Sequence, residues 1–219
     1  MKKTIFIVAI LFLAGCATQP ASLPKSWTYT GADAVTVVAA IGISTDEEFK
    51  SVLPYHFFRI SSDYSKDVMT VNTEYDPGFR NSVTDYQTAE GRFGVVKLTL
   101  KPGTYNINFI RSYSPSPYGG VTLSSNEPFS VPFTLESGKT YYLGTFTAHN
   151  ISVDGAFGSR QPVGAFWVAN TKATPNRDAI NKKYPELANT TLETYTGEFA
   201  YPPYFFKDLA DAKKLLGTD

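Results

Sequence analysis

The sequence is poor in the side chains that form disulfides and bind transition metals. It contains one cysteine, Cys16, and two histidines, His56 and His149. A single thiol excludes a disulfide within the chain, and a structural zinc site usually takes four cysteine or histidine ligands. We therefore predict no metal and no other cofactor, and a fold that its apolar core stabilises.

The sequence also lacks an excess of charge of either sign. Its 20 basic side chains are balanced by 20 acidic ones. Nucleic-acid binding depends on basic side chains that neutralise many phosphates, so the balance argues against a nucleic-acid partner.

The apolar run at the N-terminus is too short to span a membrane. Lys2 and Lys3 precede the run Ile5–Leu13, which ends at the small residues Ala14 and Gly15. A spanning helix needs about 20 apolar residues. A basic start, a short apolar run and a small-residue end are the pattern of a secretory signal.

Cys16 stands directly after this run, and Leu13-Ala14-Gly15-Cys16 resembles the lipobox of bacterial lipoproteins. The resemblance covers the first 20 residues. It implies that the Cys16 thiol takes a diacylglycerol, that the chain is cut before Cys16 and that the new amino group is acylated. Several acyl chains on one residue suffice for lasting membrane anchorage. In this family an aspartate after the cysteine favours the inner membrane, and Ala17 implies the outer membrane.

We therefore predict a signal peptide at 1–15 and a lipidated N-terminus with a tether at 16–30. The protein would be anchored in the outer membrane, with its domain facing the periplasm or the cell surface. The alternative is a free thiol at the end of a helix that is not cleaved.

Residues 31–170 carry the signature of strands and turns. Short runs rich in Val, Ile, Phe, Tyr and Thr alternate with clusters of Gly, Pro, Asn, Asp and Ser. The run Ala34–Ile43 is apolar on both faces and predicts a central strand. The other expected strands are Tyr55–Ile60, Val68–Tyr75, two hairpins at 94–110 and 129–146, and Gly164–Asn170.

Apolar and polar residues alternate in both hairpins, which predicts strands with one buried and one wet face. In the first hairpin the expected core residues are Val96, Leu98, Leu100, Tyr105, Ile107 and Phe109. In the second they are Phe129, Val131, Phe133 and Leu135. Pro132 cannot donate a ladder hydrogen bond, so its strand should lie at a sheet edge or carry a bulge.

The turn Pro-Gly-Thr-Tyr at 102–105 and the segment Gly-Lys-Thr-Tyr-Tyr-Leu at 138–143 resemble the transthyretin-like or carboxypeptidase-regulatory-like β-sandwich of many bacterial envelope lipoproteins. The resemblance covers roughly residues 90–148. It implies a mainly β fold, an antiparallel immunoglobulin-like or transthyretin-like sandwich of about eight strands. It also implies a binding or structural module, and it carries over no catalytic residue.

Residues 171–219 are expected to form a helical extension packed on the sandwich. Thr174 or Asn176 would cap a first helix that runs through Tyr184. A second helix, Lys207–Leu216, would end at Gly217 and present the apolar residues Leu209, Ala212 and Leu216 on one stripe. A swapped or partner-binding tail is the alternative.

The sequence contains no recognisable catalytic motif. The segment Gly155–Ser159 lacks the Gly-x-Ser-x-Gly arrangement of a nucleophile elbow. His56 and His149 are interpreted as strand or rim residues. The acidic run Asp46–Glu48 is interpreted as a turn or helix start, with calcium binding as a weaker alternative. We therefore predict that the protein is not an enzyme.

Two stretches rich in proline and tyrosine, Ser112–Gly120 and Phe199–Phe206, remain as candidates for binding. Tyrosine offers a large, stiff contact area with a polar tip. The candidate partner surface consists of Tyr113, Tyr118, Tyr201 and Tyr204, and packing of these rings on the protein's own core is the alternative.

The predicted function is that of an outer-membrane-anchored lipoprotein. Its non-catalytic sandwich would bind or scaffold an unidentified envelope protein or glycan, and its membrane contact would be the lipid on Cys16. The alternative is an envelope enzyme that acts on cell-wall glycan or peptide at an unrecognised site.

Overall fold

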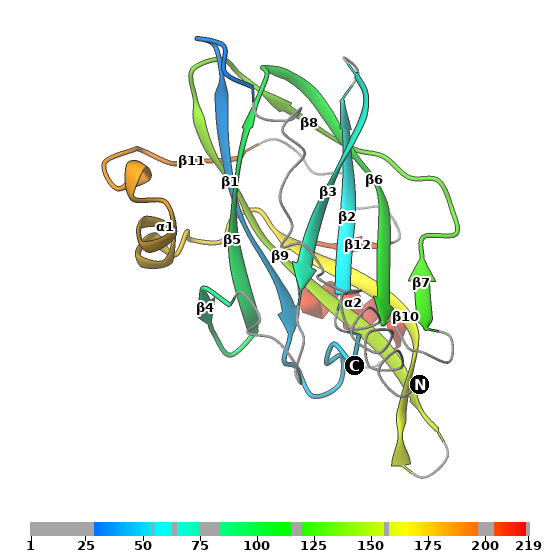
Figure 1. Ribbon diagram of the computed structural model, residues 1–219. Helices are drawn as coiled ribbons and strands as arrows, with labels where there is room; N and C mark the ends of the chain where they lie inside the picture. The colour runs from blue at the N-terminus through cyan, green and yellow to red at the C-terminus, as the bar shows by residue number, and fades with distance from the viewer. Residues whose placement is uncertain are drawn as a thin grey trace, which may run out of the picture.

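The computed structural model describes residues 29–53, 55–62, 65–74, 84–114, 120–155, 158–196 and 204–217. Strands dominate these residues, and two short helices lie beside them (Figure 1). The mainly β character predicted from the sequence is confirmed. The predicted signal peptide, Cys16 and nearly all of the predicted tether lie outside the described residues.

The described strands form two sheets. The larger has the order β12-β10-β9-β1-β5-β4, with β11 also paired to β9, and the smaller has the order β3-β2-β6-β7, with β8 also paired to β6. The strand bounds are β1 Val35–Ser44, β2 Tyr55–Ser62, β3 Ser65–Glu74, β4 Tyr86–Gln87, β5 Gly91–Leu100, β6 Gly103–Ser114, β7 Val121–Ser124, β8 Val131–Leu135, β9 Thr140–Asp154, β10 Arg160–Asn170, β11 Glu193–Thr194 and β12 Phe205–Phe206.

The larger sheet is mixed, where the sequence predicted antiparallel pairing. β1 pairs antiparallel with β5 but parallel with β9, and the pairs β10–β12 and β11–β9 are also parallel. Parallel neighbours need a long connection. The chain between β1 and β9 supplies this connection, since it forms strands of the smaller sheet and also β4 and β5 before it reaches β9. A pattern read along the sequence does not reveal this path.

The main core lies between the facing sides of the two sheets. Leu98, Phe146 and Trp167 of the larger sheet belong to the same buried cluster as Phe58, Ile60, Ile107 and Phe133 of the smaller sheet. β1 is buried along nearly its whole length between β5 and β9, so the predicted central strand is confirmed.

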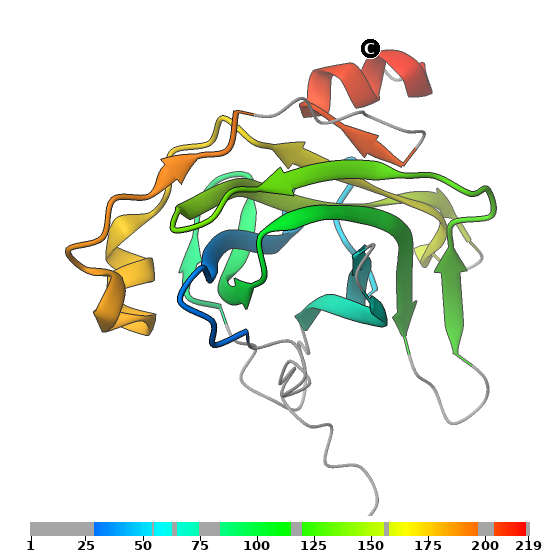
Figure 2. The same cartoon turned by 90° about the horizontal axis from the view of Figure 1, so that it is seen from above.

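The outer face of the larger sheet is also covered, which differs from the predicted wet face. α1 (Arg177–Lys183) and the turn Pro185–Leu187 contribute Ile180 and Leu187 to a cluster with Val38, Val95 and Tyr142. Helix α2 (Leu209–Leu216) covers the other end of the sheet, over β10 and β12 (Figure 2).

A bulge in β6 changes which side chains face the core. Ile60 pairs with Ile107 and Arg59 with Phe109, so Asn108 is an extra residue in the ladder. Beyond it the alternation shifts by one position, and Ile110 is buried. The prediction that Phe109 faces the core is wrong, since its ring lies under the Arg59 guanidinium, 5.1 Å from the ring centroid.

β8 follows the predicted alternation at every position. Val131, Phe133 and Leu135 are buried, and Pro132 and Thr134 are exposed. Within the described residues β8 pairs only with β6, so the edge position predicted from Pro132 is confirmed.

The C-terminal segment contains the two expected helices and two short strands besides. The Asn176 side chain caps α1 by accepting the Ala179 N–H at 3.0 Å. Asp208 caps α2, and Gly217 ends it in the left-handed conformation with φ of 69°. β11 and β12 join the larger sheet, so the extension is not purely helical.

Candidate binding groove

A groove of about 460 Å³ opens between the two sheets on one side of the core. It lies where β7 ends the smaller sheet and where β10 and β12 end the larger one. This volume falls within the range of pockets that hold ligands in proteins. None of the described residues that line the groove carries a charged side chain.

The two walls of the groove differ in chemistry. One wall comes from β6, β7 and the residues after β7, and it combines the apolar side chains of Ile110 and Leu123 with polar groups of Ser112, Ser125, Asn126 and the edge of β7. The opposite wall is apolar and consists of Ile151, Val163, Phe166, Phe206, Leu215 and Leu216. A neutral occupant with one apolar side and one hydrogen-bonding side would match both walls.

The apolar rim of the groove is unusually open to solvent. Val163 is 55% exposed, Leu215 71% and Leu216 37%. Leu216 was expected to lie on the buried stripe of the last helix, but only Ala212 of that helix is fully buried. Neighbouring exposed apolar side chains are typical of a contact surface.

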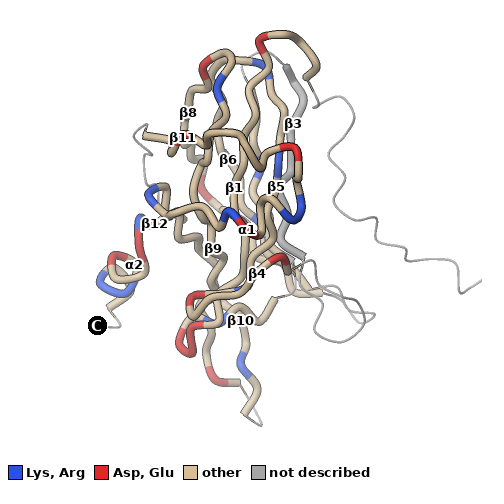
Figure 3. The backbone as a smooth tube through the Cα atoms, turned by 90° about the vertical axis from the view of Figure 1, so that its left-hand side faces the viewer, with Lys and Arg blue, Asp and Glu red and all other residues tan. Residues whose placement is uncertain are grey.

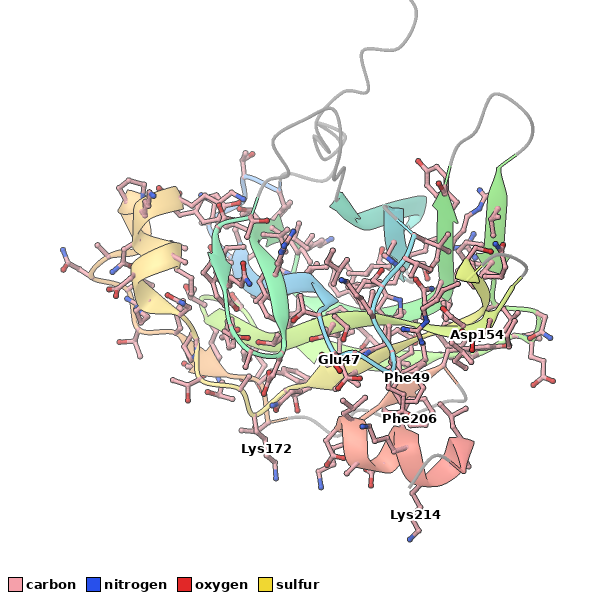
Figure 4. All side chains as sticks on the ribbon, turned by 90° about the horizontal axis from the view of Figure 1, so that it is seen from below. Glu47, Phe49, Asp154, Lys172, Phe206 and Lys214 are labelled. Carbon is pink, nitrogen blue, oxygen red and sulfur yellow. The ribbon has the colours of Figure 1, made fainter. Side chains whose placement is uncertain are left out.

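Helix α2 is fixed to the protein through Lys213. Lys213 forms an ion pair of 2.9 Å with Glu48 and lies 5.9 Å from the centroid of the Phe49 ring. Figure 4 shows Phe49 and Phe206 between the larger sheet and α2, with Lys214 pointing outward. Basic and acidic residues are interspersed along the described chain, and α2 carries both signs (Figure 3).

A buried histidine, His56, lies directly behind Ser112 in the β6–β7 wall. The His56 ring is 1% exposed. Its Nδ1 is 2.6 Å from the Ser112 Oγ, and its Nε2 is 2.5 Å from the Ser51 Oγ and 3.0 Å from the Leu53 carbonyl oxygen. Ser112 is thus the link between the groove and this histidine.

The partners of His56 fix its protonation. Burial lowers the pKa of His56 to about 4, so the ring is neutral near pH 7. The Leu53 carbonyl can only accept, so Nε2 carries the proton and donates to it, and Nδ1 accepts from the Ser112 hydroxyl. In this tautomer Nε2 cannot take a proton from Ser51.

Asn150 ties the loop 45–53 to the larger sheet. Its Oδ1 accepts the N–H groups of Val52 at 2.9 Å and Leu53 at 3.2 Å, and its Nδ2 donates to the Gly164 carbonyl at 3.3 Å. Asn150 is fully buried. These bonds use the main-chain donors next to Ser51, so they hold the loop in place.

His149 lies on the outer face of the same sheet. Its ring stacks on Phe166 with the centroids 4.9 Å apart, and its Nδ1 is buried without a hydrogen-bond partner. Burial lowers the pKa of His149 to about 4. The interpretation of both histidines as strand residues agrees with their positions in β2 and β9.

Of the predicted partner residues, the structure describes only Tyr113 and Tyr204, and these two lie in different parts of the smaller sheet and its borders. Tyr118, Tyr201 and Cys16, the predicted lipidation site, lie outside the described residues. Tyr113 is half-buried on β6, next to Ser112, so its side chain lies on the opposite face of the smaller sheet from the groove. Tyr204 lines the groove and packs on Phe129, with 5.4 Å between the ring centroids.

The acidic run Asp46–Glu48 forms a bend in the loop before Ser51. The Asp46 Oδ1 accepts the N–H groups of Glu48 at 3.0 Å and Phe49 at 3.1 Å. Within the described residues no cluster of three or more His, Cys, Asp or Glu side chains could hold a metal ion. No helix in this part of the chain is long and apolar enough to cross a membrane.

Sequence reasoning missed most of the groove. Val163 and Leu215 belong to no recognisable motif. Ser112 was included in the prediction only as the first residue of a proline- and tyrosine-rich stretch. Leu215 and Leu216 at the end of an amphipathic helix were the one signal that could have indicated an apolar contact surface.

No protein-family model and no curated protein matches the chain. Among solved structures, the chain is similar to a leucine-rich repeat protein from Bacteroides thetaiotaomicron, with 16% sequence identity and a TM-score of 0.31. The match covers 54% of this chain and 14% of that chain. A likeness at this level has no bearing on fold or function.

Proposed function

We propose that the protein is a lipid-anchored component of the bacterial cell envelope whose β domain is a non-catalytic binding module. Its anchor would be the acylated Cys16, held in the outer membrane, with the domain on the periplasmic or outer side. The support for the anchor is the sequence Leu13-Ala14-Gly15-Cys16 after a short apolar run.

The groove is the observation that carries the binding role. An uncharged cleft at the open side of the core, with Val163 and Leu215 more than half exposed at its rim, leaves apolar surface in water. Covering that surface would be favourable by about 25 cal/mol per Å². A partner bound there would therefore be stabilised by burial.

We also propose that the two packed sheets are a variant of the immunoglobulin-like or transthyretin-like β-sandwich. Their shared core and the edge strand β8 support this classification. The parallel pairs made by β9, β11 and β12 would then be additions to the basic sandwich.

The anchor is tested by replacing its only thiol. In cells fed a palmitate analogue, the wild-type protein should be labelled and Cys16→Ala should not. Because Cys16 is the only cysteine, no other side chain can form the thioether. Equal labelling of the two proteins would exclude this anchor.

The binding role is tested by crosslinking from the groove in intact cells. A photo-crosslinking amino acid at Val163, which is half exposed on the groove wall, should capture a defined envelope protein or glycan. The same probe at Val153, 50% exposed on the neighbouring strand but outside the groove lining, is the matched control. Identical products from both positions, or none from either, would contradict a binding role for the groove.

One observation favours the alternative of an envelope enzyme. Ser112 lines the groove and donates to the Nδ1 of His56, which is the contact a serine nucleophile makes with its base. Against it, Ser112 is 1% exposed, and it pairs with both His56 and Leu123 in the sheet. Hydrolysis of a neutral ester that Ser112→Ala abolishes, with the melting temperature unchanged, would favour the enzyme.

A further inference from the structure

The groove is bordered by a free sheet edge. β7 has four residues, Val121–Ser124, and among the described residues it pairs only with β6. A strand at the end of a sheet presents main-chain N–H and C=O groups that can pair with another chain. The smaller sheet therefore ends in a strand edge whose main-chain groups can pair with one more strand.

The register of β7 identifies which main-chain groups face that edge. Leu123 lies opposite Ser112, and the Ser125 N–H donates to the Ile110 carbonyl at 3.1 Å in the same register. In an antiparallel pair the hydrogen-bonded positions alternate. The N–H and C=O groups of Thr122 and Ser124 consequently point away from β6, toward the free edge.

A strand added at this edge would lie over the groove. Ile110 and Ser112 face inward from β6, and the apolar wall of β10, β12 and α2 stands opposite them. An added strand would continue the smaller sheet beyond β7 and place every second side chain toward that wall. Those side chains would meet Val163, Phe206 and Leu216.

We propose that the edge of β7 accepts an extended peptide segment of an envelope protein as an added strand, whose alternate side chains are uncharged and apolar and fill the groove. This inference rests on the proposed binding role of the groove and names the class of partner. Main-chain hydrogen bonds to Thr122 and Ser124 would give affinity, and the groove would select the side chains.

The main-chain edge of β7 beside an uncharged, largely apolar groove favours a peptide over a lipid or a glycan. An acyl chain would leave the main-chain groups of Thr122 and Ser124 at the edge of β7 without partners. A glycan would place hydroxyl groups against the aliphatic side chains of Val163, Leu215 and Leu216. A strand supplies donors and acceptors on its edge and apolar side chains on one face, and the absence of charge in the lining excludes charged residues at the inward positions.

The test uses the full-length lipidated protein in nanodiscs and a synthetic peptide of alternating valine and threonine with a lysine at each end. Binding is measured by fluorescence anisotropy of the labelled peptide. A second peptide is N-methylated at every other residue, which removes the donors on one edge and leaves the side chains in place. We expect the methylated peptide to bind at least tenfold more weakly, since an added strand depends on those donors.

Two substitutions locate the peptide on β7. Thr122→Pro removes a main-chain N–H that points away from the ladder, so folding should be retained and peptide affinity should fall at least tenfold. Val163→Asp should also lower the affinity at least tenfold, because it places a charge in the uncharged groove. Val153→Asp, a matched change on β9 outside the groove lining, should leave the affinity unchanged.

Each contrary result has one meaning. No binding of either peptide, equal binding of both, or full affinity in Val163→Asp would overturn the inference. Displacement of the peptide by a neutral monoacylglycerol, or binding of that lipid alone with sensitivity to Val163→Asp, would assign the groove to an acyl chain instead. In these cases specific crosslinking from Val163 in cells would still support the binding module, whereas its absence would contradict the proposed function itself.

Discussion

Tyr204 shows how a single tyrosine predicted to meet a partner is used within the protein. Its hydroxyl accepts the N–H groups of Asn126 at 3.2 Å and Glu127 at 3.1 Å, and it donates to the Asn126 side chain. Its carbonyl accepts the Trp167 N–H at 2.8 Å. The residue therefore joins the chain after β7 to β10, and it borders the groove through this structural role.

Replacing Tyr204 by phenylalanine should cost stability because the two main-chain donors lose their acceptor. The atoms are partly open to water, so we expect a loss of about 1 kcal/mol in a urea melt. Tyr29→Phe is the control, since the Tyr29 hydroxyl makes one exposed bond with Asp33, and it should leave stability nearly unchanged. If Tyr204→Phe matched wild type in stability but weakened groove binding, the tyrosine would be a partner contact instead.

At the scale of the element, β8 is the clearest case of alternation that decides which side chains are buried. Phe133 is 2% exposed and packs against Tyr105, with the ring centroids 5.7 Å apart. The next residue, Thr134, is exposed on the other face. Adjacent residues of this strand therefore face the core and the solvent in turn.

The two positions should respond very differently to the same substitution. Phe133→Asp places an unpaired charge among buried side chains and should destabilise the domain by at least about 3 kcal/mol. Thr134→Asp should cost less than about 1 kcal/mol, because the carboxylate stays in water. Thermal melts of both variants compare them directly, and similar losses at the two positions would show that the register of β8 is different.

The elements that could be predicted from the sequence are those whose pattern is local. β1 was recognisable because it is apolar on both faces, and β8 because Val131, Phe133 and Leu135 alternate with polar residues and Pro132. The two strands of the first hairpin were predicted, but the bulge in the second of them was not. Tyr105, Ile107 and Phe109 alternate regularly in the sequence, and only pairing with β2 shifts the phase at Asn108.

At the scale of the whole molecule, the groove could not be predicted because it exists only between elements. Ser112, Val163 and Leu216 come from β6, β10 and α2, far apart along the chain. The parallel pairing of β1 with β9 has the same origin, since it depends on the path of the chain through the smaller sheet. Neither the groove nor the parallel pairing produces a hydrophobic periodicity or a motif within a single segment of the sequence.

Two buried histidines should make the stability of the whole domain depend on pH. His56 and His149 have pKa values lowered to about 4, below the value of 6.5 for an unfolded histidine. Between these values the unfolded chain binds protons that the folded chain does not, so stability falls as the pH is lowered through this window. Well above pH 6.5 the histidines are neutral in both states and have no such effect.

The size of this effect can be measured by urea unfolding between pH 7.5 and pH 4.5. A lowering of the pKa from 6.5 to about 4 corresponds to roughly 3 kcal/mol per histidine across the window. His149→Phe should remove about half of the pH dependence, since it deletes one titrating ring. It should change stability little near pH 7, because the Nδ1 of His149 has no hydrogen-bond partner and a phenylalanine ring can stack on Phe166 in the same way. A pH dependence in His149→Phe equal to that of the wild type would mean that His149 is charged or exposed in the folded protein, and His56 would then have to account for the whole effect.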